Sequence, residues 1–271
     1  MSHFTITKPS PSFWRASFSN PPVNVFSVQT ILDLRELVDA AERDSDLTVL
    51  LFESANPEYF CAHWDLADDL SGLAGDPPTP TGQQAFVDVL IRLSKLPVIT
   101  VSSIRGRARG AGSEFVLATD IRFASRERAT IGQFEMTTGV APGGGGVSRL
   151  PRLVGRARAL EILAGADDFD ADLAALYGYV NRSIPDAELD RFVTAFAQRV
   201  AGTDRGAIAE LKSWVNATTL PEDEEFGPQS DAFFSRVAGP RVSGWISRAF
   251  EQGLQQPGDL EENLGARGFD V

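Results

Sequence analysis

The sequence is poor in residues that carry sulfur and imidazole chemistry. Its 271 residues include one cysteine, Cys61, and two histidines, His3 and His63. A single cysteine cannot form an internal disulfide, which is typical of a reducing compartment, so we expect a cytoplasmic protein. The same scarcity of soft ligands leads us to predict no metal site. With one histidine inside the expected fold and no Gly-x-Ser-x-Gly motif, a Ser-His-Asp triad is not expected either.

Long apolar runs and an excess of positive charge are also missing. Runs such as residues 48–52 and 115–118 fall far short of the ~20 residues that cross a bilayer, so we expect no membrane helix. Residues 1–11 lack the apolar core of a secretory signal. Aspartate and glutamate number 37 against 25 lysines and arginines, a net charge of −12. Nucleic-acid-binding proteins usually carry the opposite sign, so no nucleic-acid partner is predicted.

Two glycine-rich stretches fail as nucleotide-binding motifs. Residues 143–146 lack the Gly-Lys-Ser/Thr ending of a phosphate loop, and they are interpreted as a tight turn before a helix. Residues 110–112 read Gly-x-Gly, but Phe115 stands where the third glycine would be. Neither stretch therefore predicts a bound nucleotide.

Three alternating arginines, Arg105, Arg107 and Arg109, form the densest basic cluster. One interpretation is a solvated strand end or turn, where arginine charge meets water. The other is local attraction of an anionic ligand, because guanidinium groups match phosphate and carboxylate geometry. Both interpretations stay open at the level of sequence.

The first half of the chain alternates strand and helix patterns. Strands are predicted over residues 13–18, 47–52, 97–102, 121–124 and 130–131. Helices are predicted after Ser27, over residues 86–93, and from Ala111 onward. Residues 72–82, rich in proline and glycine, are predicted to form a mobile loop. This alternation predicts parallel strands joined by right-handed crossovers, and therefore an α/β fold.

The second half is mainly helical in pattern. Helices are predicted over residues 147–154, 156–164, 170–176, 188–200 and 207–217, with one strand at 179–181. Residues 222–254 are predicted to form two helices broken at Gly239 and Pro240. We expect an α/β core over residues 1–185 that holds the site and a helical region over residues 186–271.

Three stretches together supply groups that one catalytic site would use: backbone N–H donors and two carboxylates. In residues 60–66 a strand end meets a polar segment, in which Asp65 is expected to cap a helix. Residues 97–114 lead from a strand through small residues into a helix that begins near Ala111. Backbone N–H groups at a helix start have no internal partner and can receive a developing oxyanion. Glu114 follows one turn later, and residues 132–146 supply a second carboxylate, Glu135.

These stretches resemble the enoyl-CoA hydratase/isomerase, or crotonase, superfamily. Residues 22–24 are similar to its Pro-x-Asn-Ala segment and residues 60–66 to its Phe-Cys-Ala-Gly-Ala-Asp-Leu. Matches continue in chain order at residues 104–114, 134–135, 141–150 and 156–181, the last ending like the family's Gly-Leu-Val-Asn. Each motif alone is weak, but several in order at the right separations form a specific signal.

The resemblance implies a spiral of ββα repeats with a helical C-terminal region that supports trimerisation. It also implies an acyl-CoA thioester substrate, with coenzyme A part of the substrate and no separate cofactor. The backbone N–H groups of Trp64 and Ala111 would form the oxyanion hole, and Glu114 and Glu135 would act as acid and base. The implied substrate contacts are Ala62, Asp65, Gly110 and Phe134.

The chain departs from the family pattern at four positions. His63 stands in place of glycine, Trp64 in place of alanine, Ala111 in place of glycine and Phe134 in place of proline. These replacements predict a crowded site. His63 has two interpretations: a third donor to the thioester oxygen, or a residue bonded to local backbone. Cys61 is predicted to be a small buried hydrophobic residue without nucleophilic function.

The function favoured by these residues is hydration of a 2-enoyl-CoA. Alternatives within the same fold are double-bond isomerisation, thioester hydrolysis and C–C bond hydrolysis, and a further alternative is acyl-CoA binding without turnover. A homotrimer or a dimer of trimers is also expected, carried by apolar residues of the last helices. These residues are Phe226, Phe233, Phe234, Val237, Trp245 and Phe250.

Overall fold

The computed structural model describes residues 2–68 and 78–271 and contains two β-sheets. The larger sheet has the strand order β1-β2-β3-β5-β7-β10 and the smaller one β4-β6-β8-β9. The strands of the larger sheet are β1 (Phe4–Ser10), β2 (Phe13–Phe18), β3 (Val49–Ser54), β5 (Ile99–Ile104), β7 (Ile121–Ser125) and β10 (Arg182–Ile184). Those of the smaller sheet are β4 (Tyr59–Cys61), β6 (Arg107–Arg109), β8 (Thr130–Gly132) and β9 (Asp168–Asp170).

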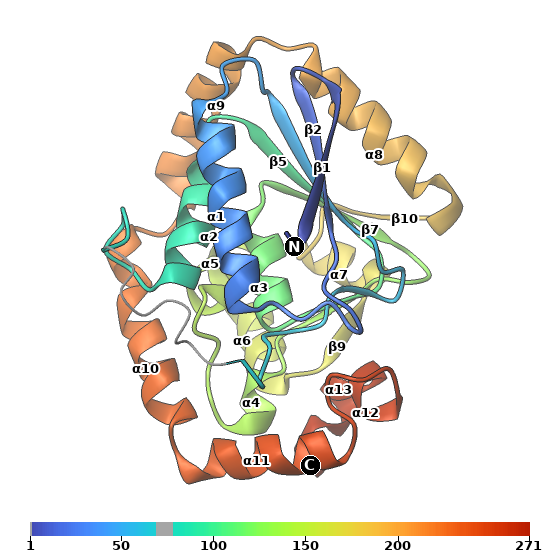
Figure 1. Cartoon of the computed structure of the whole chain (residues 1–271), viewed down its shortest axis with the longest axis vertical. Coiled ribbons are helices and arrows are strands. Elements are labelled where there is room, and N and C mark those ends of the chain that lie inside the picture. Colours follow the sequence, from blue (N-terminus) through green and yellow to red (C-terminus); the bar gives the residue numbers. More distant parts are fainter. Residues whose placement is uncertain (1, 69–77) are drawn as a thin grey trace.

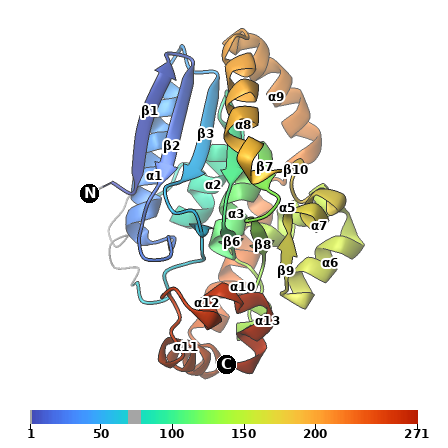
Figure 2. The same ribbon diagram turned by 90° about the vertical axis from the view of Figure 1, so that its right-hand side faces the viewer.

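From β3 to β8, successive strands alternate between the two sheets, and a helix follows each pair. Thus β3 and β4 precede α2 (Ala85–Lys95), β5 and β6 precede α3 (Ala111–Ala118), and β7 and β8 precede α4 (Glu135–Thr138). Within each sheet the strands of successive repeats pair in parallel. Figures 1 and 2 show the smaller sheet between the larger one and the last helices. The predicted α/β spiral of ββα repeats is confirmed.

Helices cover both faces of the larger sheet (Figure 1). On one face lie α1 (Val28–Arg43), α2 and α3, whose apolar residues join the main core. On the other face α8 (Asp186–Ala201) packs Leu189, Val193 and Ala197 against sheet residues such as Leu51 and Val101. The predicted division at residue 185 therefore passes between β10 and α8, and α8 completes the sheet's second layer.

The remaining helices are α5 (Gly146–Val154), α6 (Arg156–Gly165), α7 (Ala171–Tyr177), α9 (Arg205–Thr219), α10 (Gly227–Val237), α11 (Pro240–Glu251), α12 (Asp259–Glu262) and α13 (Leu264–Arg267). Of these, α9 lies at the upper end of the molecule near α8, and the others lie around the smaller sheet and in the lower part (Figures 1 and 2). The break at Gly239 and Pro240 separates α10 from α11 as expected, because proline suits the first turn of a helix.

Several local predictions need correction. The strand expected at residues 179–181 lies at β10, and strands β1 and β9 were not expected at all. Only Phe4 of β1 is buried, so this edge strand lacks the alternating pattern that marks a half-buried strand. No helix begins at Leu66: the Asp65 carboxylate accepts from Ala67 N–H within a turn. Of the loop expected over residues 72–82, residues 72–77 lie outside the described residues.

The three arginines of residues 105–109 tie elements of the fold together. Arg105 pairs with Asp186 at 2.7 Å. Arg109 is fully buried, and its Nε and Nη2 donate to the two carboxylate oxygens of Asp168 at 2.6 Å. Arg107 donates to the backbone carbonyl of Glu262. Neither the solvated interpretation nor the anion-binding one fits Arg109, because its hydrogen bonds are satisfied inside the protein.

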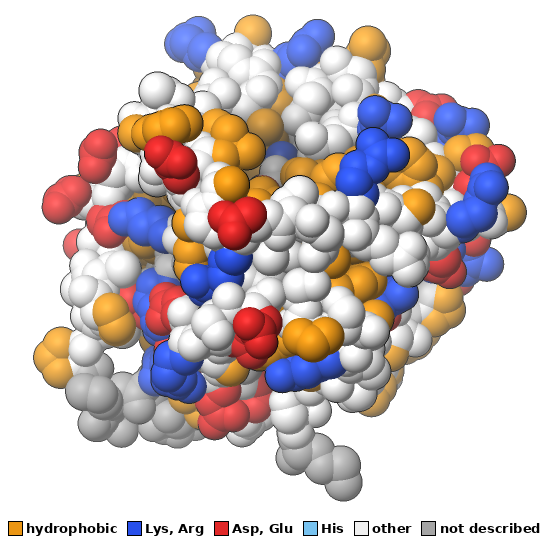
Figure 3. Space-filling model, turned by 90° about the horizontal axis from the view of Figure 1, so that it is seen from above, with side chains coloured by type: hydrophobic (Ala, Val, Ile, Leu, Met, Phe, Trp, Pro, Cys, Tyr) orange, Lys and Arg blue, Asp and Glu red, His pale blue; other side chains and the backbone are white. Residues whose placement is uncertain are grey.

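Figure 3 shows basic and acidic side chains side by side on the end of the molecule that carries β2, α8 and α9. The net charge of −12 is therefore not gathered into a single acidic surface on this face.

Among the residues that the structure describes, no helix has the length and apolarity that crossing a membrane requires.

Candidate active site

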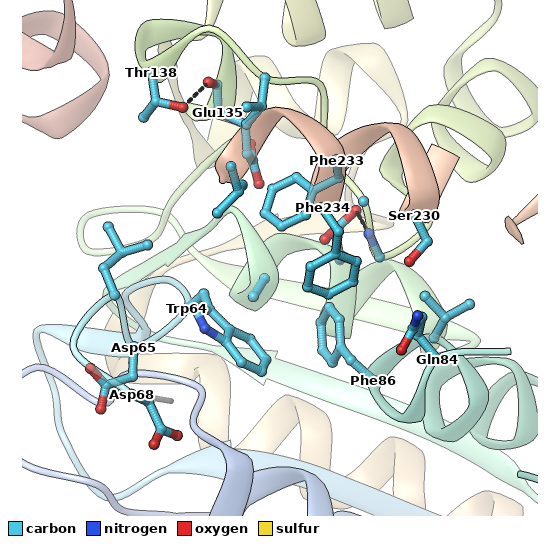
Figure 4. A pocket seen from close by; sticks show the side chains of 18 of the residues that line it. Trp64, Asp65, Asp68, Gln84, Phe86, Glu135, Thr138, Ser230, Phe233 and Phe234 are labelled. Carbon is cyan, nitrogen blue, oxygen red and sulfur yellow. Dashed lines mark hydrogen bonds between the residues drawn. The ribbon is translucent and has the colours of Figure 1, made fainter. Parts of the chain in front are cut away.

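A cavity of about 320 Å³ lies where the ββα repeats meet the C-terminal helices. Trp64, Ala111, Glu114 and Glu135 line it from the repeats, and apolar side chains of α10 and α11 line it from the opposite side. Figure 4 shows the rings of Phe233 and Phe234 facing those of Trp64 and Phe86 across this space. The cavity is concave, mostly apolar and supplied with a few converging polar groups, as binding sites for small molecules usually are.

A close backbone approach brings two separate parts of the chain to the cavity. A Cβ atom added to Gly112 would lie 2.1 Å from the carbonyl oxygen of Cys61, so only glycine permits this contact between α3 and β4. The approach places the loop after β4, with Trp64, beside the first turn of α3, with Ala111. Cys61 itself is buried, and burial raises the pKa of its thiol, as expected of a core residue.

The N–H groups of Trp64 and Ala111 are free to meet a ligand. The carbonyl of His63 accepts from Phe26 N–H at 2.7 Å, so the Trp64 N–H of the same planar peptide points the opposite way. Ala111 is the first residue of α3, where an N–H has no intrahelical acceptor. Over residues 2–68 and 78–271, neither N–H donates to another group of the chain.

Glu114 is held by the turn that precedes α5. Its Oε1 accepts from Gly144 N–H at 2.8 Å and from Gly146 N–H at 2.9 Å. The glycine-rich turn therefore cradles a carboxylate of the protein itself. Burial raises the pKa of Glu114 to about 7, even though the turn N–H groups and the nearby Arg149 guanidinium favour the charged form.

Glu135 lies in the first turn of α4 and is almost fully buried. Its backbone carbonyl accepts from the Thr138 hydroxyl at 2.8 Å, and its side chain points toward the cavity (Figure 4). The Gln133 amide can donate to Glu135 Oε2 at 3.1 Å while its oxygen accepts from Ser113 Oγ at 2.9 Å. Burial and then the negative charge of Glu114 raise the pKa of Glu135 well above its ordinary value.

The structure separates the other predicted substrate contacts into two groups. Phe134 and Asp65 line the cavity, as do Trp64 and Ala111. Gly110 lies just behind Glu135, because an added Cβ would be 2.9 Å from Glu135 Oε1. Ala62 is buried in a small apolar cluster and does not line the cavity.

His63 is placed behind the cavity wall. Its ring is fully buried, lies 5.5 Å from the ring of Phe134, and does not line the cavity. Nδ1 lies 2.6 Å from the carbonyl oxygen of Trp64, and Nε2 lies 3.2 Å from the Glu261 carboxylate. The geometry therefore favours neither of the two roles considered from the sequence, a direct donor to a ligand or a residue bonded to local backbone alone.

Sequence reasoning missed the part of the site that comes from distant segments. From the sequence, only a tight turn is predicted for the segment that contains Gly144 and Gly146, and nothing in it signals Glu261. The sequence predicts a subunit interface for Phe233 and Phe234 of α10, and the structure shows that they also line the cavity. The glycines before α5 were the available signal, since closely spaced backbone N–H groups form an anion cradle.

Comparisons with known proteins agree with this architecture. Residues 12–236 match the family described as enoyl-CoA hydratase/isomerase. The chain belongs to this family, within the crotonase superfamily, and is an enzyme of the enoyl-CoA hydratase/isomerase type. Among the residues that the structure describes, no group of acidic, cysteine and histidine side chains is arranged to hold a metal.

Individual relatives cover most of the chain. A crotonyl-CoA hydratase of Syntrophomonas wolfei is 31% identical over 214 residues, which are 78% of this chain and 80% of that protein. A solved structure from Streptomyces avermitilis, provisionally assigned as an enoyl-CoA hydratase, is 38% identical with a TM-score of 0.94, covering 99% and 97% of the two chains. An enoyl-CoA hydratase from Mycobacterium avium subsp. paratuberculosis shares the fold at 21% identity, with a TM-score of 0.81 and 95% and 98% of the chains covered.

Proposed function

We propose that this enzyme adds water across the double bond of a 2-enoyl-CoA thioester. The observation that carries the proposal is a pair of buried carboxylates, Glu114 and Glu135, that line one cavity in unequal environments. The name of the Syntrophomonas relative, a crotonyl-CoA hydratase, agrees with this reaction. Coenzyme A enters as part of the substrate, and no other cofactor is required.

Glu114 is the proposed base. Two N–H groups of the turn stabilise its carboxylate, and its pKa of about 7 allows it to be ionised near neutral pH. A group of this pKa is well suited to take a proton from water at neutral pH. In the proposed step the water oxygen bonds to the β-carbon of the substrate while its proton passes to Glu114.

Glu135 is the proposed acid. Burial and the charge of Glu114 keep it protonated where Glu114 is ionised, so the pair shares one proton. As water attacks, the double-bond electrons move through the α-carbon to the thioester oxygen and form an enolate. The Glu135 proton then passes to the α-carbon, the thioester carbonyl re-forms, and the product is a 3-hydroxyacyl thioester.

The enolate oxygen requires donors while its charge develops. The N–H groups of Trp64 and Ala111 are unpaired within the described chain and border the cavity, which supports their role as an oxyanion hole. Donors that are fixed before reaction stabilise charge without reorganisation, and loss of one commonly lowers the rate about 10²-fold or more.

The walls of the cavity favour an uncharged hydrocarbon acyl group. Aromatic rings of Trp64, Phe86, Phe134, Phe233 and Phe234 surround the space next to the two glutamates. A charged acyl terminus would lose its water among these rings, which offer it no hydrogen bond, and this loss is costly. The predicted crowding by Trp64 and Phe134 agrees with these ring contacts.

Glutamine variants test the assignment of the two glutamates. Glu114→Gln and Glu135→Gln should each lower turnover by about 10²–10⁴ because each removes a proton-transfer group. The measurement is loss of ultraviolet absorbance of the conjugated enoyl thioester, with a panel of short, medium and aromatic 2-enoyl-CoA thioesters. Glu36→Gln, an exposed position on α1, is the matched control and should retain wild-type turnover.

The same assay separates hydration from the alternative reactions. Unchanged turnover in either glutamine variant would remove that glutamate from the mechanism. A product whose double bond has moved without gain of water would indicate isomerisation. Release of free coenzyme A would indicate thioester hydrolysis, and binding without any product would indicate a protein that only holds acyl-CoA.

A further inference from the structure

A C-terminal segment contacts the chain next to both donors of the proposed oxyanion hole, the N–H groups of Trp64 and Ala111. Residues 255–262, called the strap below, lie between α11 and α13 and contact the loop of Trp64 as well as the strand before Ala111. Figure 2 shows α12, which contains much of the strap, close to β6 and β9. Nothing in the predicted mechanism uses these residues.

The first attachment is to the loop that carries Trp64. Gln255 Oε1 accepts from Leu66 N–H at 2.8 Å, and Gln255 Nε2 donates to Asp65 Oδ1 at 2.8 Å. The backbone N–H of Gln255 in turn donates to Glu261 Oε2 at 2.8 Å. Glu261 therefore links two parts of the strap, and Gln255 holds the two residues after Trp64.

The second attachment is a buried pair of Glu261 and His63. His63 Nε2 lies 3.2 Å from both carboxylate oxygens, and both side chains are fully buried. A carbonyl oxygen can only accept a hydrogen bond, so His63 Nδ1, 2.6 Å from the Trp64 carbonyl, is a protonated nitrogen. The proton between Nε2 and Glu261 completes a chain of contacts from the strap through His63 to the peptide of Trp64.

The third attachment reaches the other donor. Arg109 stands two residues before Ala111 and is fully buried. Its guanidinium donates to the carbonyls of Glu261 at 2.7 Å and Glu262 at 2.9 Å, and its remaining bonds go to Asp168. Although burial opposes it, the charge of His63 and then that of Arg109 favour the ionised carboxylate and lower the pKa of Glu261.

We propose that Glu261 is a positioning residue for the two donors: its carboxylate fixes the Trp64 peptide through His63 and Gln255, and its backbone carbonyl holds Arg109, two residues before Ala111. This inference rests on the proposed use of those N–H groups as an oxyanion hole. His63 does not contact the ligand; it transmits the position of Glu261 to the Trp64 peptide. Small displacements of an aligned donor can cost about 10²-fold in rate, so fixing both donors from one segment has a catalytic consequence.

Glu261→Gln tests the proposal, because it keeps the shape of the side chain and removes its charge. We expect kcat on a 2-enoyl-CoA to fall about 10²-fold, whereas the Kd for a saturated acyl-CoA, which forms no enolate, stays within about twofold. Glu251→Gln, an exposed glutamate at the end of α11, makes the same change of charge and should leave both quantities unchanged.

A spectroscopic readout separates positioning from general stability. Difference infrared spectra of a carbonyl-labelled saturated acyl-CoA bound to the wild type should show a lowered thioester carbonyl stretch, which Glu261→Gln should largely reverse. If Glu261→Gln alone folds poorly, the double variant His63→Gln with Glu261→Gln takes its place. It removes both charges of the buried pair, so no buried charge is left without a partner. It should show the same loss of carbonyl polarisation.

The outcomes distinguish this proposal from the proposed function. A polarised carbonyl in the wild type that is lost in Glu261→Gln supports the strap, even if no water is added to any enoyl thioester. Wild-type kcat and carbonyl stretch in a folded Glu261→Gln variant would overturn the positioning role while leaving hydration intact. A wild type that leaves the carbonyl stretch unshifted would overturn both the oxyanion hole and the strap.

Discussion

At the scale of single residues, the two glutamates differ because their neighbours differ. Both are buried, which raises the pKa of each carboxyl. Glu114 alone accepts two backbone N–H groups and lies near the Arg149 guanidinium, and these partners favour its charged form. Glu135 instead faces the charge of Glu114. The asymmetry that separates a base from an acid therefore comes from hydrogen-bond donors, since burial is common to both.

This asymmetry predicts a pH profile. The base must be ionised, and the pKa of Glu114 is raised to about 7, so kcat/KM should fall about tenfold per pH unit below about pH 7. On the alkaline side activity should fall again as Glu135 loses its proton, because its pKa is raised further. The measurement is kcat/KM on an active 2-enoyl-CoA from mildly acidic to mildly alkaline pH. A rate that stays level on the acidic side, in protein shown by circular dichroism to be folded, would contradict Glu114 as the base.

At the scale of elements, the turn before α5 serves the site through its backbone. Gly144 and Gly146 present N–H groups to Glu114, and there is no room for a side chain at Gly144. A Cβ atom added at Gly144 would lie 2.5 Å from Glu114 Oε2 and 2.3 Å from a ring carbon of Phe86. Glycine is therefore required there for close approach to the carboxylate.

Gly144→Ala should lower kcat about 10²-fold, because the new methyl group displaces the Glu114 carboxylate from its donors. Gly165→Ala is the matched control: a Cβ atom there meets nothing within 4 Å, and the position is exposed at the end of α6. Turnover is the readout, with thermal unfolding measured in parallel. Equal kcat for the two alanine variants would show that the cradle does not set the reactivity of Glu114.

The C-terminal helices also act at this scale. Apolar side chains of α10 and α11 close the cavity, and Phe233 packs on Gly143 of the same turn. Trp245 is buried and its indole N–H donates to the Gly268 carbonyl at 2.8 Å. Phe233 and Trp245 therefore have their packing partners within one chain.

At the scale of the whole molecule, exposed apolar residues lie on α7 and α9 as well as on the last helices, where Phe234 and Phe250 are each 37% exposed. Leu211, Trp214 and Val215 of α9 are 54%, 64% and 50% exposed, and Leu176 at the end of α7 is 69% exposed. Ile208 and Lys212 form the buried side of α9, where Lys212 donates to Asp120 at 2.7 Å. Contiguous exposed apolar residues are typical of protein interfaces.

A homotrimer or a dimer of trimers stays a prediction, now with α9 as its proposed contact. Light scattering at micromolar concentration should give three or six times the chain mass of 29.3 kDa. Leu211→Glu combined with Trp214→Glu should reduce the mass to that of one chain, because charges buried in an interface are costly. A wild-type mass of 29.3 kDa would refute the prediction, and an unchanged mass in the double variant would exclude α9 as the contact.

Sequence alone determined the repeated strand-helix pattern, the helix that begins at Ala111, and the family. These features depend on local signals: periodic apolar residues, small residues at a turn, and motifs with short spacing. Glu114 and Glu135 could be predicted as site residues from the sequence, because each lies within its own motif. Strands β1 and β9 could not be predicted, because only one residue of each is buried and no alternating pattern marks them.

Only the tertiary structure decided how the predicted residues are used. Glu114 takes its hydrogen bonds from a turn 30 and 32 residues away, and His63 faces a carboxylate 198 residues along the chain. Nothing local to Glu261 signals this contact, because it depends on where α11 ends and how the strap returns over β6. Propensity and periodicity describe a segment by its own residues, whereas pKa shifts and donor positions depend on groups that only folding brings together.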